Sequence, residues 1–166
     1  VDVRGANNID FNGPYSKIGD FVLDNSTWTI EGALDVSGNL VLNNSTLKVS
    51  GGVRVGGDLR MTESNLTLKN DLNVTSNITL ASGSVLSHYA ATLDDWWKLN
   101  INAASVEVDS SSSIDVSGKG YQGGNGDIPG RTRGNVAAST GYSGGSYGGY
   151  GGGCGSGDIA DEIYGD

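Results

Sequence analysis

Cysteine and histidine are almost missing from this chain of 166 residues, which has one of each. The single cysteine, Cys154, cannot form a disulfide within these residues. Zinc needs three or four Cys, His or carboxylate ligands, and the lack of such a set excludes a structural zinc site here. A serine or cysteine nucleophile needs a base beside it, and the lone histidine, His88, is more typical of a loop residue than of a catalyst.

Long hydrophobic runs and excess positive charge are lacking as well. No stretch approaches the roughly 18 apolar residues that a membrane-spanning helix needs, so no membrane insertion is expected. Ten Lys and Arg residues against nineteen Asp and Glu residues give a net charge of −9. An acidic surface repels phosphate backbones, which makes nucleic acid a poor partner. The sequence starts at Val1 without the pattern of a signal peptide, as a mature product or a fragment would.

Helical periodicity is also absent, whereas short alternating runs of apolar residues are frequent. The residues Phe21, Leu40, Leu59 and Ile78 follow one another at intervals of 19, and Leu23, Leu42, Met61 and Leu80 repeat the same interval. Further pairs at this period are Trp28/Ile30, Leu47/Val49 and Leu66/Leu68, with Val85 starting the next, and Leu34/Val36, Val53/Val55 and Leu72/Val74. Each 19-residue unit therefore holds three short strands.

The corners between these strands repeat at the same period. Gly32, Gly51 and Asn70 share one corner, and these residue types tolerate a left-handed backbone. Another corner has the serines Ser26, Ser45 and Ser64, whose hydroxyls can bond the backbone of a turn.

One architecture satisfies this common period, an all-β, right-handed parallel β-helix (β-solenoid) in which each strand pairs with its equivalents above and below. Inward residues then stack as apolar ladders about 4.8 Å apart. Outward residues stack too, so Asp35 and Arg54 are expected to pair. An antiparallel sandwich also has short strands, but it does not require a fixed register of 19 residues.

The expected organisation has three parts and one insert. Residues 1–20 form an irregular leading coil or cap, and residues 21–117 form the solenoid coils. An insert near residues 88–98 interrupts the fourth coil, after which Leu99/Ile101, Val106/Val108 and Ile114/Val116 resume the strand pattern. Residues 118–166 form a glycine-rich segment, which packs or contacts a neighbouring subunit.

The insert and the glycine-rich segment hold the remaining candidate sites. Asp94, Asp95, Trp96 and Trp97 could form a sugar-stacking platform, a subunit contact or a loop packed on the solenoid. No cofactor is expected, although calcium could use Asp94 with Asp95, or Asp158, Asp161 and Glu162, a spacing that matches no known ligand scheme. Tyrosines interleave with glycines and favour packing: Tyr121, Tyr142, Tyr147, Tyr150 and Tyr164. Cys154 is a candidate intermolecular thiol, and no strand–loop–helix context supports phosphate binding by the glycines.

Six N-x-S/T acceptor patterns make covalent glycans a further prediction. Their asparagines are Asn25, Asn43, Asn44, Asn65, Asn73 and Asn77. The alternative is that turns rich in Asn, Ser and Thr contain such triplets through their composition alone, without being glycosylated. Asn25 and Asn44 share a corner where a glycan would point into solvent, and of the adjacent Asn43 and Asn44 at most one is expected to be modified.

The 19-residue coils, followed by a glycine-rich stretch with the run GGSYGGYGGG, resemble the pectin-lyase-like parallel β-helix of large extracellular, adhesin-type surface proteins. The resemblance covers most of the chain and implies an extracellular or cell-surface location. Enzymes of that class carry Asp, Arg and Lys clusters in a groove along several coils. The strand positions predicted to face outward here give no acidic cluster, which argues against an enzyme.

Two functions from different classes follow. The first is a non-enzymatic, glycosylated structural or adhesive module whose partners are copies of itself or neighbouring modules in a fibre. The second is a carbohydrate-active β-helix enzyme or a carbohydrate-binding module.

Overall fold

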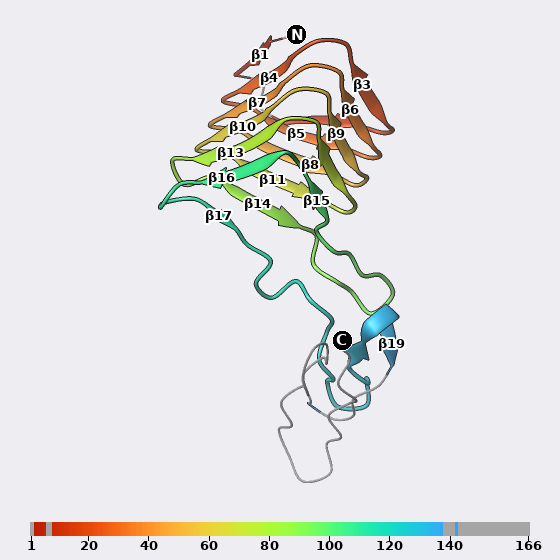
Figure 1. Ribbon diagram of the computed structural model, residues 1–166. Helices are drawn as coiled ribbons and strands as arrows, with labels where there is room; N and C mark the ends of the chain where they lie inside the picture. Colours follow the sequence, from red (N-terminus) through yellow and green to blue (C-terminus); the bar gives the residue numbers. More distant parts are fainter. Residues whose placement is uncertain (1, 6–7, 138–141, 143–166) are drawn as a thin grey trace. The chain divides into compact units, whose positions relative to one another are not determined.

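The computed structural model describes residues 2–5, 8–137 and 142, and it shows an all-β parallel solenoid (Figure 1). Each strand of the solenoid lies in parallel beside its equivalent from the next coil. The predicted fold class is thereby confirmed, with coils of about 19 residues and almost no helix.

Three sheets form the walls of the solenoid. Sheet A contains β1 (Asp2–Arg4), β4 (Phe21–Asp24), β7 (Leu40–Asn43), β10 (Leu59–Thr62), β13 (Asn77–Ala81) and β16 (Ser105–Val108). Sheet B contains β2 (Ile9–Phe11), β5 (Thr27–Ile30), β8 (Thr46–Val49), β11 (Asn65–Leu68), β14 (Val85–His88) and β17 (Ser113–Ile114). Sheet C contains β3 (Tyr15–Lys17), β6 (Leu34–Val36), β9 (Val53–Val55), β12 (Leu72–Val74) and β15 (Ile101–Asn102).

The core consists of inward side chains stacked in register. Leu23, Leu42, Met61 and Leu80 form the predicted ladder in sheet A, and all are buried. Fully burying one such side chain stabilises the fold by roughly 1.5–3 kcal/mol before the ordering entropy is subtracted. No single coil could bury its own apolar face, so stability depends on the stack.

One ladder departs from the expected period. Leu66 pairs with Leu86 and not with Val85, because the corner before β14 is one residue longer than its predecessors. Ser82 and Gly83 in that corner both have positive φ, 56° and 80°. The extra residue shifts the alternation, so Leu86 is buried in place of Val85.

The serine corner is held by a buried hydrogen-bond ladder. The Ser45 N–H donates to Ser64 Oγ at 3.0 Å, and the Ser64 hydroxyl donates to the Thr62 carbonyl at 2.7 Å. The same pair of bonds repeats at Ser26 and at Ser84. Each hydroxyl satisfies a corner N–H that the strands leave without a partner.

The described residues before β4 differ from the expected irregular coil, because their three strands pair in register with β4, β5 and β6. Four aromatic rings pack together at this end of the core. The ring of Phe11 lies 4.8 Å from Tyr15 and 4.9 Å from Trp28, and Phe21 lies 5.1 Å from Trp28. The leading residues are therefore a regular first coil with an aromatic end.

A second compact unit contains the insert residues Ala90–Trp97 and the chain from Ser117 onward. Within it, β18 (Arg131–Thr132), the 3-10 turn η1 (Arg133–Asn135) and β19 (Val136–Ala137) follow one another. Arg131 Nε and Asn135 Nδ2 both donate to the Leu93 carbonyl, at 3.0 and 2.9 Å. The insert thus packs against this following segment. Nowhere in the described ranges is a helix long and apolar enough to cross a membrane.

Candidate functional site

The corner between sheets A and B presents two of the acceptor asparagines side by side. Asn25 and Asn44 are exposed and have left-handed backbones, with φ of 49° and 43°. Asn44 Nδ2 donates to Asn25 Oδ1 at 3.0 Å. Since the coils are only about 4.8 Å apart, two bulky glycans on this pair would collide. The geometry therefore accommodates one modification at this corner.

The other acceptor asparagines occupy different faces of the solenoid. Asn43 ends β7 and is half-buried, whereas Asn65 begins β11 and is exposed. Asn73 faces outward from β12. Asn77 begins β13, and its Oδ1 accepts a hydrogen bond from Ser105 Oγ at 2.7 Å. The six positions therefore do not form one surface.

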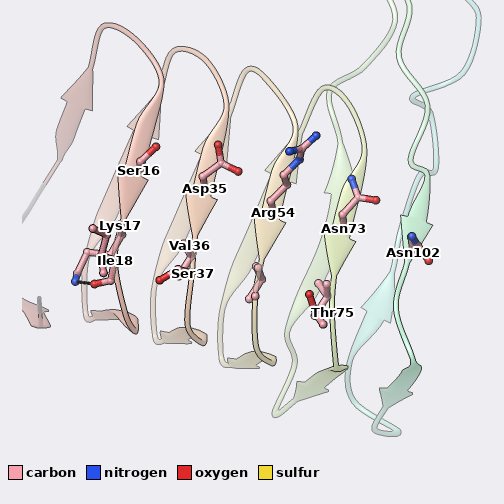
Figure 2. Close-up of a pocket in the computed structure, with 13 residues that line it drawn as sticks. Ser16, Lys17, Ile18, Asp35, Val36, Ser37, Arg54, Asn73, Thr75 and Asn102 are labelled. Atoms are coloured by element: carbon pink, nitrogen blue, oxygen red, sulfur yellow. Dashed lines mark hydrogen bonds between the residues drawn. The ribbon is translucent and has the colours of Figure 1, made fainter.

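A groove with a volume of about 450 Å³ runs across the outer face of sheet C. Each strand contributes one outward residue to a row at equal register, namely Ser16, Asp35, Arg54, Asn73 and Asn102 (Figure 2). Neighbouring strands are about 4.8 Å apart, so the row extends over about 19 Å. It offers a carboxylate, a guanidinium, two amides and a hydroxyl to an elongated polar ligand.

The central charges of this row do not bond to each other. Asp35 and Arg54 are neighbours in register, but within the described ranges neither side chain has an ion-pair or hydrogen-bond partner. The predicted Asp35–Arg54 pair is therefore wrong, and both groups remain available to solvent or to a ligand. Ser16, Asp35 and Arg54 follow one another at the 19-residue period, so the sequence indicated this part of the row. Asn102 does not follow that period, because the insert precedes it.

His88 is placed in the core and not in a loop. It ends β14 in register with the buried Leu68, and only 6% of its surface is exposed. Its Nδ1 lies 2.6 Å from the Tyr89 carbonyl oxygen. His88 therefore belongs to the inner face of sheet B and lines none of the surface grooves described.

The aromatic and acidic residues of the insert lie in the second unit. Trp96 is 39% exposed, and its ring centroid lies 5.7 Å from that of Tyr121. Asp94 and Asp95 are exposed in a turn in which the Asp95 N–H donates to Thr92 Oγ1 at 2.9 Å. The structure brings Trp96 together with Tyr121, a pair that the sequence did not link, while the sugar-platform assignment stays a prediction.

Asp109, at the corner after β16, is a polar residue that the sequence analysis missed. Its carboxylate accepts hydrogen bonds from the Ser82 N–H at 2.7 Å and from the N–H and hydroxyl of Ser111, both at 2.9 Å. Hydrogen bonds to the charged carboxylate hold the pKa of Asp109 well below its usual range. The bond from the Ser82 N–H has the largest effect, and the Ser112 and Ser111 hydroxyls and the Ser111 N–H add to it. The run of serines directly after a strand-ending aspartate was the available signal.

This depressed pKa predicts a pH-dependent contribution to stability. The charged carboxylate stabilises the fold above the unfolded-state pKa of about 3.9, and this contribution is lost as the pH falls toward the lower folded-state pKa. We expect Asp109→Asn to lower the melting temperature at pH 7 and to differ less from the wild type near pH 2 than at pH 7. Asp10→Asn is the control, since Asp10 is exposed on β2 and has no hydrogen bond within the described ranges. An Asp109→Asn deficit that is equal at both pH values would contradict the assignment.

The remaining candidate residues lie outside the part of the chain that the structure describes. These are Cys154, Tyr147, Tyr150, Tyr164, Asp158, Asp161 and Glu162. Among the residues that are described, no three His, Cys, Asp or Glu side chains gather closely enough to hold a metal ion.

No protein-family model matches this chain, and comparison with curated proteins and with solved structures gave no match either.

Proposed function

We propose that this chain is a non-enzymatic extracellular module that serves as a structural or adhesive unit in a surface fibre or larger assembly. The observation that carries the proposal is the continuous stack of backbone, serine and core ladders. Each coil bonds to the next through parallel pairing and through corner bonds such as Ser45 N–H to Ser64 Oγ. A stack of this kind is stiff and repeats the same face at each coil, properties that suit a spacer or an adhesive surface.

Two further features support the proposal. The only histidine lies in the apolar core, away from the outward serines and threonines that would need a base for nucleophilic catalysis. The resemblance of the coils to pectin-lyase-like, adhesin-type surface proteins points the same way. The exposed corner of Asn25 and Asn44 adds a position where one covalent glycan fits without disturbing the core.

Immunogold labelling of intact native cells tests the location, and intact mass before and after glycosidase treatment tests the glycan. We expect gold particles on the outer surface and a fall in mass on treatment. Label confined to the cell interior would contradict the extracellular function. An unchanged mass in material from a glycosylating host would remove the glycan alone.

A second candidate function is carbohydrate binding or carbohydrate-active catalysis, and the groove on sheet C favours it. Its row of polar side chains suits a chain of sugar hydroxyls, and Arg54 suits an acidic sugar. We expect Arg54→Ala to weaken binding of an acidic polysaccharide, with or without calcium, by about tenfold, since a charge-assisted bond contributes roughly 1.5–3 kcal/mol. Thr29→Ala on sheet B is the control. Equal binding by both variants, or no binding by the wild type, would exclude this function for the groove.

A further inference from the structure

Among the described residues, the last coil of the solenoid exposes an apolar face. Four large apolar residues of its last coil are 40–45% exposed, namely Val106, Val108, Ile114 and Val116. Ile78 and Leu80, which precede Val106 and Val108 in the same ladders, are 0% exposed. In the described residues no further strand follows β16 or β17 in these sheets, and from Ser117 the chain belongs to the second unit.

The free edges of β16 and β17 accompany this face. In the described part of the chain each of these strands pairs on one side only, so its other side presents backbone N–H and C=O groups. Unpaired edges of parallel strands are templates for a further strand. Together, an uncovered apolar face and two open edges make a docking surface.

The first coil of the same chain fits this surface. β1 and β2 are the opposite edges of the two sheets that end at β16 and β17. Ile9 and Phe11 are only partly buried, and Ile9 begins the ladder that ends at Ile114. The first coil of another copy therefore matches the coil that would continue the stack beyond β16 and β17. It has the same cross-section, the same strand direction and the same alternation of inward and outward side chains.

We infer that the C-terminal end binds the first coil of a second copy of this chain, head to tail. β16 pairs with β1 of the neighbouring copy, and β17 pairs with its β2. This inference rests on the proposed function and specifies the contact that builds the assembly. A head-to-tail contact that does not close produces a filament.

Sheet C has no part in the contact, and its first strand, β3, carries residues that protect its free edge from pairing. The last coil has no sheet C strand, so β15 and the neighbour's β3 remain one strand apart. Pro14 precedes β3, and Lys17 occupies the position of the inward Val36 and Val55. Proline and an inward-position lysine are devices that protect an edge from pairing.

Outward residues at the junction give the contact a salt dependence. Continued register puts Asp10 of the neighbouring copy after Asp115, because Asp10 follows Ile9 and Asp115 follows Ile114, the two ends of one ladder. This like-charge position opposes association at low ionic strength. Because salt screens exposed charges, added salt is expected to strengthen the contact.

Sedimentation of the 166-residue chain over a range of concentrations tests the inference first. We expect the mean mass to rise with concentration and to rise further with added NaCl. A monodisperse monomer at every concentration and salt level would overturn the inference without any variant. Surface labelling that fails while this association is found would remove the proposed function and leave the contact in place.

Two blocking variants test the orientation. Val108→Glu charges the C-terminal face and Ile9→Glu charges the first coil, whereas Val41→Glu, at an outward half-buried position of β7, is the matched control. Each blocking variant is expected to weaken self-association at least about tenfold, as loss of an apolar interface contact does. An equimolar mixture of the two should form a 1:1 dimer with wild-type affinity, because one intact junction remains. Undiminished association of Ile9→Glu would overturn the head-to-tail contact in favour of two C-terminal faces meeting.

Discussion

Replacing Leu42 by aspartate is expected to prevent folding. Leu42 is 0% exposed and lies between Leu23 and Met61 in the inward ladder of sheet A. A carboxylate there would be buried without a partner, at a cost of several kcal/mol. Since domains are stable by only about 5–15 kcal/mol, most or all of the fold's stability would be lost.

Circular dichroism and urea unfolding measure this effect against two matched variants. Val41→Asp puts the same charge on the same strand facing outward, and it is expected to retain the native spectrum. Leu42→Ala leaves a cavity but no charge, and it should lose about 2–5 kcal/mol. A folded Leu42→Asp protein with wild-type stability would contradict the inward position of Leu42.

Gly51→Ala is expected to lower the melting temperature by about 10 °C, the consequence of roughly 3 kcal/mol of overpacking. A Cβ at Gly51 would lie 2.6 Å from the carbonyl carbon and oxygen of Gly32 and 2.7 Å from the Ala33 nitrogen. These atoms are backbone of the neighbouring coil, so they cannot move aside without breaking the stacking distance.

Gly120→Ala is the control for this substitution. No heavy atom lies within 4 Å of a Cβ at Gly120, so its melting temperature should stay close to that of the wild type. A Gly51→Ala protein as stable as Gly120→Ala would show that the coils are farther apart at this corner than the structure has them.

The solenoid was predictable because one physical requirement repeats along the chain. Every coil must stack apolar residues on those of the previous coil, so Phe21, Leu40 and Leu59 recur at equal distances in sequence and in register. The serine corner was predictable for the same reason, since each hydroxyl accepts a hydrogen bond from the backbone of the preceding coil. In both cases the signal came from the period of 19 and needed no information on distant contacts.

The corner glycines show where residue type alone was misleading. Gly51 has no positive φ, and it is small because the previous coil approaches closely. Gly32, the equivalent of Gly51 one coil earlier, does have a positive φ of 143°, and further positive φ values lie at Asn25, Asn44 and Glu63, one residue before the corner serines. A positive φ and a close approach of the neighbouring backbone both favour glycine, and the sequence alone does not separate these two causes.

The candidate site was predictable only where it obeys the repeat. The groove residues Asp35 and Arg54 occupy equivalent positions, but their failure to pair depends on side-chain rotamers that no spacing encodes. The burial of His88 depends on the extra corner residue before β14. The packing of the insert at Leu93 against Arg131 joins segments far apart in the chain and has no periodic signal.

The most direct test of the stacked coils uses the only methionine, Met61. In a methyl-labelled sample, a nuclear Overhauser spectrum should show contacts from the Met61 methyl to both Leu42 and Leu80, each 19 residues away. Substitution of Leu42 or Leu80 by isoleucine assigns each cross-peak by removing it. Cross-peaks to both leucines are the result that the solenoid predicts, and a Met61 methyl with contacts to neither would contradict it.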